Sequence, residues 1–183
     1  MSSTGSDGLL GRRNDAMEAG PRDERDHQSL RRCPGNRSRR MTEDAIEPFA
    51  PAHLDGLIAL VAGEGWTEYT DDRERTYRAL TAPGVTTLVA TVGGRVVGAI
   101  QVQSDGLIQA HVSMLLIDAN RRGLGLGSRL LRDGLECAGG LQLDVRTRTE
   151  GYYERLGASR SLGFRLTRED LGLSHKGAKS GRQ

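Results

Sequence analysis

The sequence predicts a single mixed α/β domain in which a mostly antiparallel sheet is flanked by helices. Residues 86–117 contain three β-branched, apolar runs separated by the two-residue turn signals Gly93-Gly94 and Asp105-Gly106, as in an antiparallel meander. A glycine-rich loop then joins the third run to an amphipathic helix, and a further apolar run follows. This strand, helix and strand imply a crossover connection, so the two strands are expected to lie parallel and adjacent.

Length and composition exclude several classes of protein. The 183 residues suit one domain with extensions, and the two cysteines, Cys33 and Cys137, have neither a metal-ligand nor a redox spacing. No apolar run is long enough to cross a membrane, and the N-terminus lacks the apolar core of a signal peptide. We therefore expect a protein of the reducing cytoplasm, without disulfides, metal or membrane partner.

The positive charge of the chain is concentrated near its N-terminus. The formal charge is +2, but residues 1–40 hold 9 Arg against 6 Asp and Glu, which leaves the remaining residues with a net charge of −1. A domain of balanced charge has no general affinity for nucleic acid. Residues 1–40 have too few apolar side chains to offset the entropy of ordering, so we expect a disordered, arginine-rich tail.

Three interpretations of this tail stay open. It is an arm for an anionic partner, a solvated tail, or the product of a start codon assigned too far upstream, with the true start at Met41. We favour the second and third over the first. The folded domain is expected to span residues 41–171, and residues 172–183, rich in Gly, Ser and Lys, are expected to form a flexible C-terminal tail.

The first part of the domain is expected to form a short strand and two helices. Residues 45–49 read as a strand that a proline confines to an edge. The next helix has four apolar residues on one face, namely Leu54, Leu57, Ile58 and Val61. Residues 71–82 form the second helix, because Asp71 and Glu74 have the spacing of a capping box and Pro83 stops the helix.

The remaining elements alternate between strands and helices. The expected strands are residues 86–92, 95–104, 107–117 and 141–145, with a weaker extended stretch at 162–166, and the expected helices are residues 126–138 and 149–156. Gly98, inside the second strand of the meander, indicates a bulge or a close contact. The run from residue 107 is long for one strand, which favours a kink within it.

The glycine-rich loop before the helix at residue 126 predicts a phosphorylated ligand. A helix N-terminus has unpaired N–H groups and a partial positive charge, and both suit a phosphate. Gly123 and Gly125 begin a dinucleotide-binding motif, but Ser128 stands where the third glycine is required, and no P-loop motif is present. The ligand is therefore expected to be bound by a different type of phosphate loop.

Two separated motifs resemble those of a known family. Arg122, Gly125 and Gly127 have the spacing Arg-x-x-Gly-x-Gly, and residues 152–157 read Tyr-Tyr-Glu-Arg-Leu-Gly. These motifs, together with the order of the preceding strands and helices, resemble the GCN5-related N-acetyltransferases over roughly residues 41–166. The resemblance implies a sheet that splays between its fourth and fifth strands, with acetyl-CoA as the acyl donor in the gap.

The resemblance also implies which residues would contact acetyl-CoA. Its pyrophosphate would accept hydrogen bonds from the N–H groups of residues 123–128, and its pantetheine would pair with the backbone of residues 115–117. The expected contact residues are Leu115, Leu116, Ile117, Arg122, Gly123, Leu124, Gly125, Leu126, Gly127 and Ser128. Arg122 either adds charge toward the phosphates or caps and packs the turn, whereas Arg121 is expected to be a solvated neighbour.

Amine acetylation needs an unprotonated amine and a proton for the departing thiolate. In the family a tyrosine after the fifth strand commonly supplies that proton. The resemblance assigns this role to Tyr153, which directly precedes Glu-Arg-Leu-Gly, in preference to Tyr152. The alternative is that both tyrosines only pack a short helix.

The resemblance further suggests His111 as the base. Some family members have a glutamate on the fourth strand, eleven residues before the first position of the glycine motif, and this chain has His111 there. An unperturbed imidazole titrates near neutral pH, so it can accept a proton directly or through water. The alternatives are a histidine with a structural hydrogen bond and deprotonation by water alone.

The acceptor is expected in a groove between the first two helices and the sheet. Trp66 and Tyr69 would line this groove, and Glu68, Asp71 or Asp72 would attract a cation. The alternatives are core filling by the aromatic residues and helix capping by the acidic ones.

Taken together, the motifs predict an acyltransferase that transfers acetyl from acetyl-CoA to a primary amine by direct attack in a ternary complex. The acceptor would be a small molecule or a peptide, and the resemblance makes a homodimer plausible. The alternative from another class is a non-catalytic CoA-binding sensor or interaction domain with the same fold.

Overall fold

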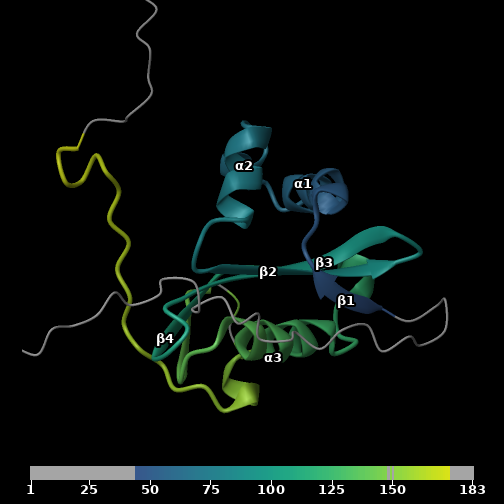
Figure 1. The fold of residues 1–183 in the computed structure, drawn as a ribbon. Helices are drawn as coiled ribbons and strands as arrows, with labels where there is room; N and C mark the ends of the chain where they lie inside the picture. Colours follow the sequence, from purple (N-terminus) through teal and green to yellow (C-terminus); the bar gives the residue numbers. More distant parts are fainter. Residues whose placement is uncertain (1–43, 148, 150, 174–183) are drawn as a thin grey trace, which may run out of the picture. The chain divides into compact units, whose positions relative to one another are not determined.

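The computed structural model describes residues 44–147, 149 and 151–173. The predicted N-terminal tail lies outside these residues, and so does most of the predicted C-terminal tail. Five strands form one sheet in sequential order (Figure 1). They are β1 (Ala45–Pro48), β2 (Val85–Val92), β3 (Arg95–Ser104), β4 (Gln109–Ile117) and β5 (Gln142–Val145). All neighbours are antiparallel except β4 and β5, which are parallel, so the predicted fold class is confirmed.

Helices cover both faces of the sheet (Figure 1). The pair α1 (Leu54–Ala62) and α2 (Arg73–Leu80) lies on one face, and α3 (Leu126–Ala138) lies on the other. The described residues also contain single turns of 3-10 helix, namely η1 (Pro51–His53), η2 (Thr67–Tyr69), η3 (Ala119–Arg121) and η4 (Glu154–Leu156). The predicted bounds of α3 are confirmed, because its leucines repeat at helical spacing and are buried against the sheet.

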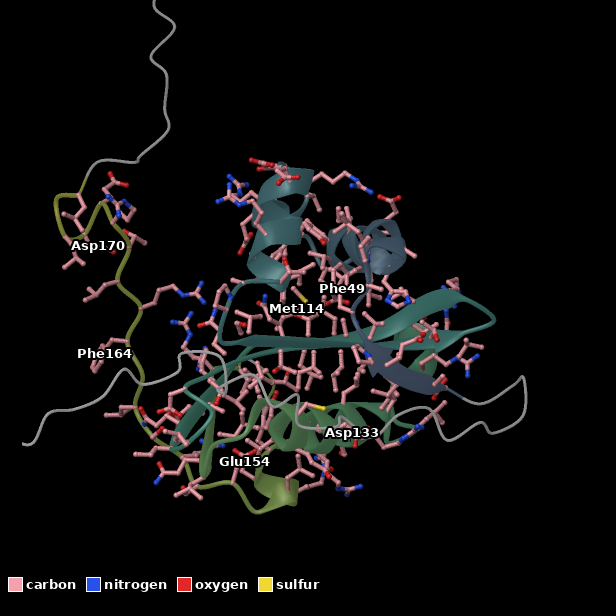
Figure 2. The ribbon with its side chains drawn as sticks, in the orientation of Figure 1. Phe49, Met114, Asp133, Glu154, Phe164 and Asp170 are labelled. Carbon is pink, nitrogen blue, oxygen red and sulfur yellow. The ribbon has the colours of Figure 1, made fainter. Side chains whose placement is uncertain are left out.

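Each face of the sheet has its own hydrophobic core. The core under α3 contains Leu88, Ala90, Val97, Ile100, Val102, Ala110, Val112, Leu126, Leu130 and Leu131. The core under α1 and α2 contains Leu54, Leu57, Val61, Leu80, Val89, Val96, Ala99, Met114 and Leu116. Met114 lies between the sheet and these two helices (Figure 2). Because both faces are covered, a ligand can reach the strands at the β4–β5 edge of the sheet.

A β-bulge interrupts β3 beside Gly98. Val97 is left over between Val96 and Gly98, both of which pair with β2. Gly98 also packs closely, because a Cβ there would lie 3.2 Å from side-chain atoms of both Ile117 and Leu130. The bulge and the close contact expected at this glycine are both confirmed.

A second bulge interrupts β4 at Ser113. Val112 and Met114 pair with neighbouring residues of β3, and Ser113 is left over between them. An extra residue reverses the alternation of side chains along a strand. Val112 therefore packs under α3, whereas Met114 packs under α1 and α2. The irregularity expected in this long strand is confirmed, and it divides β4 between the two cores.

The connection between β3 and β4 is longer than the predicted two-residue turn. The Asp105 carboxylate accepts hydrogen bonds from the N–H groups of Leu107, Ile108 and Gln109, at 2.8, 2.8 and 3.2 Å. These backbone hydrogen bonds lower the pKa of Asp105. They hold residues 105–108 in a loop, so β4 begins at Gln109 and the expectation that it begins at residue 107 is wrong.

The second helix is capped one residue later than expected. Asp72, rather than Asp71, is its N-cap, because the Asp72 carboxylate accepts a hydrogen bond from the Arg75 N–H at 2.9 Å. The helix accordingly begins at Arg73 and ends at Leu80, short of the predicted bounds at both ends.

The segment after β5 is less regular than predicted. The helix expected at residues 149–156 is reduced to η4, because Gly151 has a φ of 76° that interrupts a right-handed helix. No strand forms at residues 162–166, where Leu162, Phe164 and Leu166 are 94, 89 and 68% exposed. Figure 2 shows Phe164 on a segment that carries no sheet partner. An alternation of apolar and polar residues does not produce a β-strand unless a partner strand is present to accept and donate the backbone hydrogen bonds.

Gly139 at the end of α3 provides a test of the packing between α3 and the β3–β4 loop. Its φ of 73° and ψ of −173° belong to a region that only glycine adopts readily, and a Cβ would lie 2.8 Å from the Gly106 carbonyl oxygen. We expect Gly139→Ala to lower the free energy of unfolding by about 3 kcal/mol, measured by urea denaturation. The control is Gly157→Ala, at a φ of 82° in open space, which should lower the free energy of unfolding by about 1 kcal/mol. An equal loss of stability in the two variants would contradict the close contact between Gly139 and Gly106.

Candidate active site

The opening between β4 and β5 forms the candidate site. The parallel ladder joins residues 109–112 to residues 142–145 and ends directly before the bulge at Ser113. From residue 113 to residue 117 the β5-facing edge of β4 has no strand partner among the described residues. A cavity of about 1310 Å³ follows this edge, and residues from both faces of the sheet line it. The splay expected between the fourth and fifth strands is confirmed.

The glycine loop lies at one end of this cavity, at the start of α3. None of the backbone N–H groups of residues 123–128 donates to an acceptor within the described part of the chain. Gly123 and Gly125 have φ values of 76° and 81°, and a Cβ at either would meet no atom within 4 Å. The start of the 13-residue helix α3 adds a partial positive charge. Free donors, open space and positive charge together fit a phosphate group.

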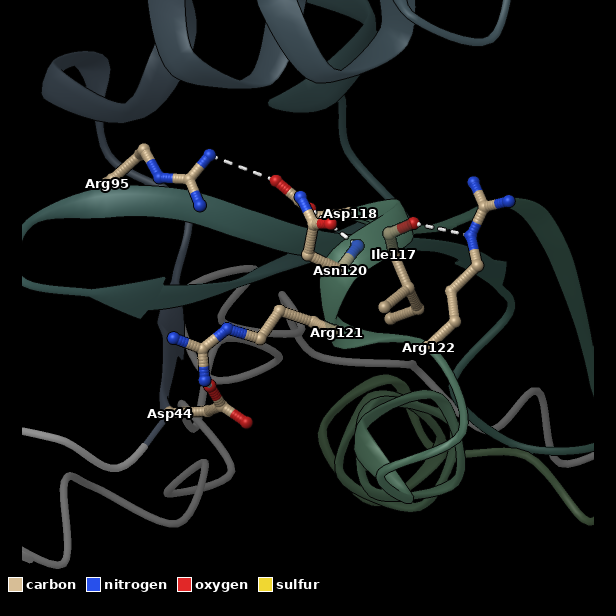
Figure 3. A network of polar contacts seen from close by, with 7 residues as sticks. All are labelled: Asp44, Arg95, Ile117, Asp118, Asn120, Arg121 and Arg122. Atoms are coloured by element: carbon tan, nitrogen blue, oxygen red, sulfur yellow. Dashed lines mark hydrogen bonds and ion pairs between the residues drawn. The ribbon is translucent and has the colours of Figure 1, made fainter.

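Arg122 caps the end of β4 (Figure 3). Its Nε donates to the carbonyl oxygen of Ile117 at 3.0 Å, and its Nη2 forms an ion pair with Glu64, beyond the end of α1. These contacts match the second of the two roles considered for Arg122, in which it caps and packs the turn. This arrangement fixes the loop against α1.

The residues around η3 hold the turn between β4 and the glycine loop (Figure 3). Arg95 pairs with Asp118 at 2.9 Å, and the other oxygen of Asp118 accepts from the Asn120 N–H at 3.0 Å. These hydrogen bonds lower the pKa of Asp118. Arg121 is partly buried and pairs with Asp44 at 3.4 Å, so it is not the solvated neighbour that was expected. The loop is thus attached to β1, β3 and α1.

Tyr152 and Tyr153 line the cavity with different surroundings. The Tyr152 hydroxyl lies 3.2 Å from the Ser128 hydroxyl, at the start of α3, and a Cβ on Gly127 would approach it to 2.9 Å. Tyr153 is half-buried, its ring packs edge-on against Tyr152, and its hydroxyl forms no hydrogen bond with a described residue. Burial, and then Tyr152, raise the pKa of Tyr153. Its hydroxyl therefore stays protonated at neutral pH and is available as a donor.

His111 lines the same cavity from β4. Its neighbours Ala110 and Val112 face the core under α3, so His111 faces the side of α1 and α2. The residue is exposed, and its imidazole forms no hydrogen bond with a described residue. Among the described residues it therefore has no partner for the structural hydrogen bond considered as an alternative.

A buried glutamine supports the bulge that separates His111 from the open edge of β4. Gln101, 2% exposed, donates from Nε2 to the Ala79 carbonyl oxygen at 2.9 Å, and its Oε1 accepts from the Ser113 hydroxyl at 2.8 Å. The bulge is thereby connected to the end of α2. Nothing in the local sequence pattern indicates this network, because its members come from three elements.

The expected acceptor residues lie on the α1 and α2 side of the cavity. Trp66, Glu68 and Tyr69 line it, and the rings of Trp66 and Tyr69 lie 6.3 Å apart. Burial and Glu68 raise the pKa of Tyr69, whereas Arg165 lowers it. Asp71 and Asp72 do not line the cavity, and Asp72 caps α2, which is the alternative considered for the acidic residues.

Sequence reasoning missed the arginines of this cavity. Arg75, Arg146, Arg155 and Arg165 line it, in addition to the two arginines of the loop. They come from α2, from the chain after β5, from η4 and from the segment near residue 165, so no local motif contains them. The part of the chain that the structure describes contains no helix long and apolar enough to span a membrane.

The comparison with family models settles the classification of this fold. A model of the acetyltransferase (GNAT) domain matches residues 40–169. The chain belongs to the GNAT acetyltransferase family. The family supports N-acetyltransferase activity at a general level, and GNAT domains typically use acetyl-CoA.

Solved structures with this GNAT fold cover most of the domain. A protein of Deinococcus radiodurans R1 assigned as an acetyltransferase is 28% identical, with a TM-score of 0.56, over 73% of this chain and 94% of that one. A GNAT family protein of Streptococcus pneumoniae TIGR4 is 23% identical, with a TM-score of 0.56, over 69% and 99%. A transcriptional regulator of Bacillus halodurans C-125 is 19% identical, with a TM-score of 0.59, over 68% and 99%. No match was found among curated proteins.

Proposed function

We propose that this GNAT domain transfers an acetyl group from acetyl-CoA to a primary amine, by direct attack within a ternary complex. The observation that carries the proposal is the set of N–H groups at residues 123–128, which bond to no described residue and open into the same cavity as Tyr153 and His111. Acetyl-CoA supplies the thioester carbonyl carbon and a thiolate leaving group. The chain must then bind both substrates, take a proton from the amine and return one to the sulfur.

The residues of the loop and of β4 would hold the donor. The N–H groups of residues 123–128 are available to phosphate oxygens, and the backbone of Leu115, Leu116 and Ile117 lies on the unpaired edge of β4. Arg122 and Tyr152 would fix the loop rather than bind the donor, because their polar atoms already contact Ile117, Glu64 and Ser128. The acetyl group would then lie where β4 and β5 separate.

Two side chains are suited to the proton transfers. His111 faces the acceptor side of the cavity and takes the amine proton, directly or through water, as the N–C bond forms. Tyr153 donates its hydroxyl proton to the sulfur as the C–S bond breaks. Because burial raises the pKa of Tyr153, this proton is retained across the neutral and mildly alkaline range in which amines become nucleophilic.

The role of His111 is tested by a pH profile. We expect His111→Ala to lower kcat/KM at pH 7 by about 10²-fold, with a remaining pH dependence that follows the ionisation of the amine alone. The rate should not fall on the alkaline side up to pH 9, because Tyr153 keeps its proton there. Gln109→Ala, two residues earlier on the same strand, is the control. An unchanged profile in His111→Ala would leave water as the base.

The proposal itself is tested with the purified full-length chain. Release of free thiol from acetyl-CoA is measured with a panel of amines, and acetyl-CoA binding is measured by calorimetry. We expect binding together with amine-dependent thiol release. Binding without release across the panel would instead assign a non-catalytic CoA-binding domain, and no binding at all would reject both.

A further inference from the structure

The cavity contains more basic than acidic side chains. Six arginines line it, Arg75, Arg121, Arg122, Arg146, Arg155 and Arg165, against two glutamates, Glu64 and Glu68. Two of the arginines pair within the fold, one with Asp44 and one with Glu64. The other four form no ion pair with a described residue. The cavity therefore has positive charge that the described part of the protein does not neutralise.

Three of these arginines approach the acceptor side from separate segments. Arg75, on α2, donates from Nη2 to the carbonyl oxygen of Glu68 at 3.2 Å. Arg165 is close enough to Tyr69 to lower the pKa of that tyrosine. A Cβ on Gly163 would lie 3.9 Å from Cδ of Arg146, which brings the segment of Arg165 to the end of β5. Arg75 and Arg165 thus lie near Glu68 and Tyr69, and Arg146 lies near the segment that carries Arg165.

The proposed phosphate site has its own donors, the N–H groups of residues 123–128 at the start of α3, which bond to no described residue. His111, which faces the side of the sheet that carries Arg75 and α2, precedes Ile117 by six residues, or roughly 20 Å along the strand. The loop follows Ile117 and leads into α3, on the other face of the sheet. The charge of Arg75, Arg146 and Arg165 is therefore not needed to explain the proposed phosphate contacts of residues 123–128.

We propose that the amine acceptor also carries a carboxylate or phosphate group, which Arg75, Arg146 and Arg165 bind. The inference rests on the proposed acetyl transfer. Guanidinium groups bind both anions through paired, charge-assisted hydrogen bonds. Glu68, the one lining carboxylate without an ion pair among the described residues, is placed to attract the ammonium form of the same molecule. A simple polycation would meet three arginines that repel it.

Binding of the acceptor can be followed without turnover. Trp66 is the single tryptophan of the chain and lines the cavity, so its fluorescence reports occupancy of the acceptor side. In the presence of CoA, the protein is titrated with L-leucine against L-leucinamide, and with phosphoethanolamine against ethanolamine. In at least one pair, we expect the member that carries the carboxylate or phosphate group to bind about tenfold more tightly. The pair that responds distinguishes a carboxylate from a phosphate.

Single variants identify the arginines involved. Arg75→Gln, Arg146→Gln and Arg165→Gln should each lower the affinity for the amine that carries the carboxylate or phosphate about tenfold, and should not lower the affinity for its partner without that group. Arg78→Gln, on α2 but outside the cavity, is the control. Equal affinity within both pairs, including no binding by any of the four amines, would overturn the proposal, as would an unchanged preference in all three variants. Thiol release separately decides whether acetyl transfer occurs.

Discussion

Replacement of Tyr153 by phenylalanine is expected to lower kcat by about 10²-fold or more while the affinity for acetyl-CoA stays within about twofold. The change removes only the hydroxyl, whose proton burial retains at neutral pH, and it leaves the ring packed against Tyr152. Steady-state thiol release measures kcat, and calorimetry measures the dissociation constant of acetyl-CoA. A loss in kcat without a loss in affinity would identify a group that acts in the transition state.

Tyr152 provides the matched control for this experiment. Its hydroxyl contacts Ser128 at 3.2 Å, so Tyr152→Phe should alter the start of α3 and weaken acetyl-CoA binding modestly, with little effect on kcat. If both variants keep full turnover, neither tyrosine donates the proton. If Tyr152→Phe alone loses kcat, the assignment based on the Glu-Arg-Leu-Gly motif is wrong.

Introduction of a carboxylate into the glycine loop should abolish tight donor binding. We expect Gly125→Asp to raise the dissociation constant of acetyl-CoA about 10²-fold or more, because the new charge lies at the start of α3 and competes with phosphate for the free N–H groups. Aspartate tolerates the left-handed conformation better than most residues, so the fold should be retained. Calorimetry measures the binding, and thermal unfolding without ligand measures the stability.

Gly94→Asp separates the effect of charge from that of backbone strain. Gly94 has a φ of 79°, close to the 81° of Gly125, and a Cβ at either position meets no atom within 4 Å. Gly94 lies in the β2–β3 turn, away from the cavity. Its variant should therefore lose similar stability but bind acetyl-CoA normally. Equal losses of affinity in the two variants would mean that strain, not the anion site, explains the result.

The elements of this domain were predictable where local pattern and burial coincide. The strands β2 and β3 are continuous β-branched runs, and α3 carries leucines at helical spacing, so each short stretch specifies its own conformation. The predicted bounds were wrong where a single side chain determines at which residue an element begins. Asp72 caps α2 although Asp71 has the better capping-box spacing, and Asp105 holds three N–H groups and so delays β4.

The candidate site likewise contains parts that the sequence predicts and parts that it does not. The glycine loop and the Tyr153 segment are contiguous motifs, so the sequence alone indicates them. The Gln101 network and the cavity arginines form only through tertiary contact, because their members are separated by tens of residues and belong to different elements. Residues 162–166 show the converse case. The alternating pattern predicts a strand there, but no described strand pairs with these residues, so no strand forms.

The extra residue at Ser113 ends the parallel ladder and so opens the edge of β4. A β4 strand without it would alternate regularly, and Val112 and Met114 would keep the faces on which they are now buried. Both cores would therefore survive a deletion of Ser113, and a straight strand would allow the parallel ladder with β5 to continue past Val112. The deletion would remove the opening rather than the fold. It would also leave the buried amide oxygen of Gln101 without the Ser113 hydroxyl, at a cost of about 1–3 kcal/mol, so the residue that opens the edge of β4 also satisfies a buried polar group.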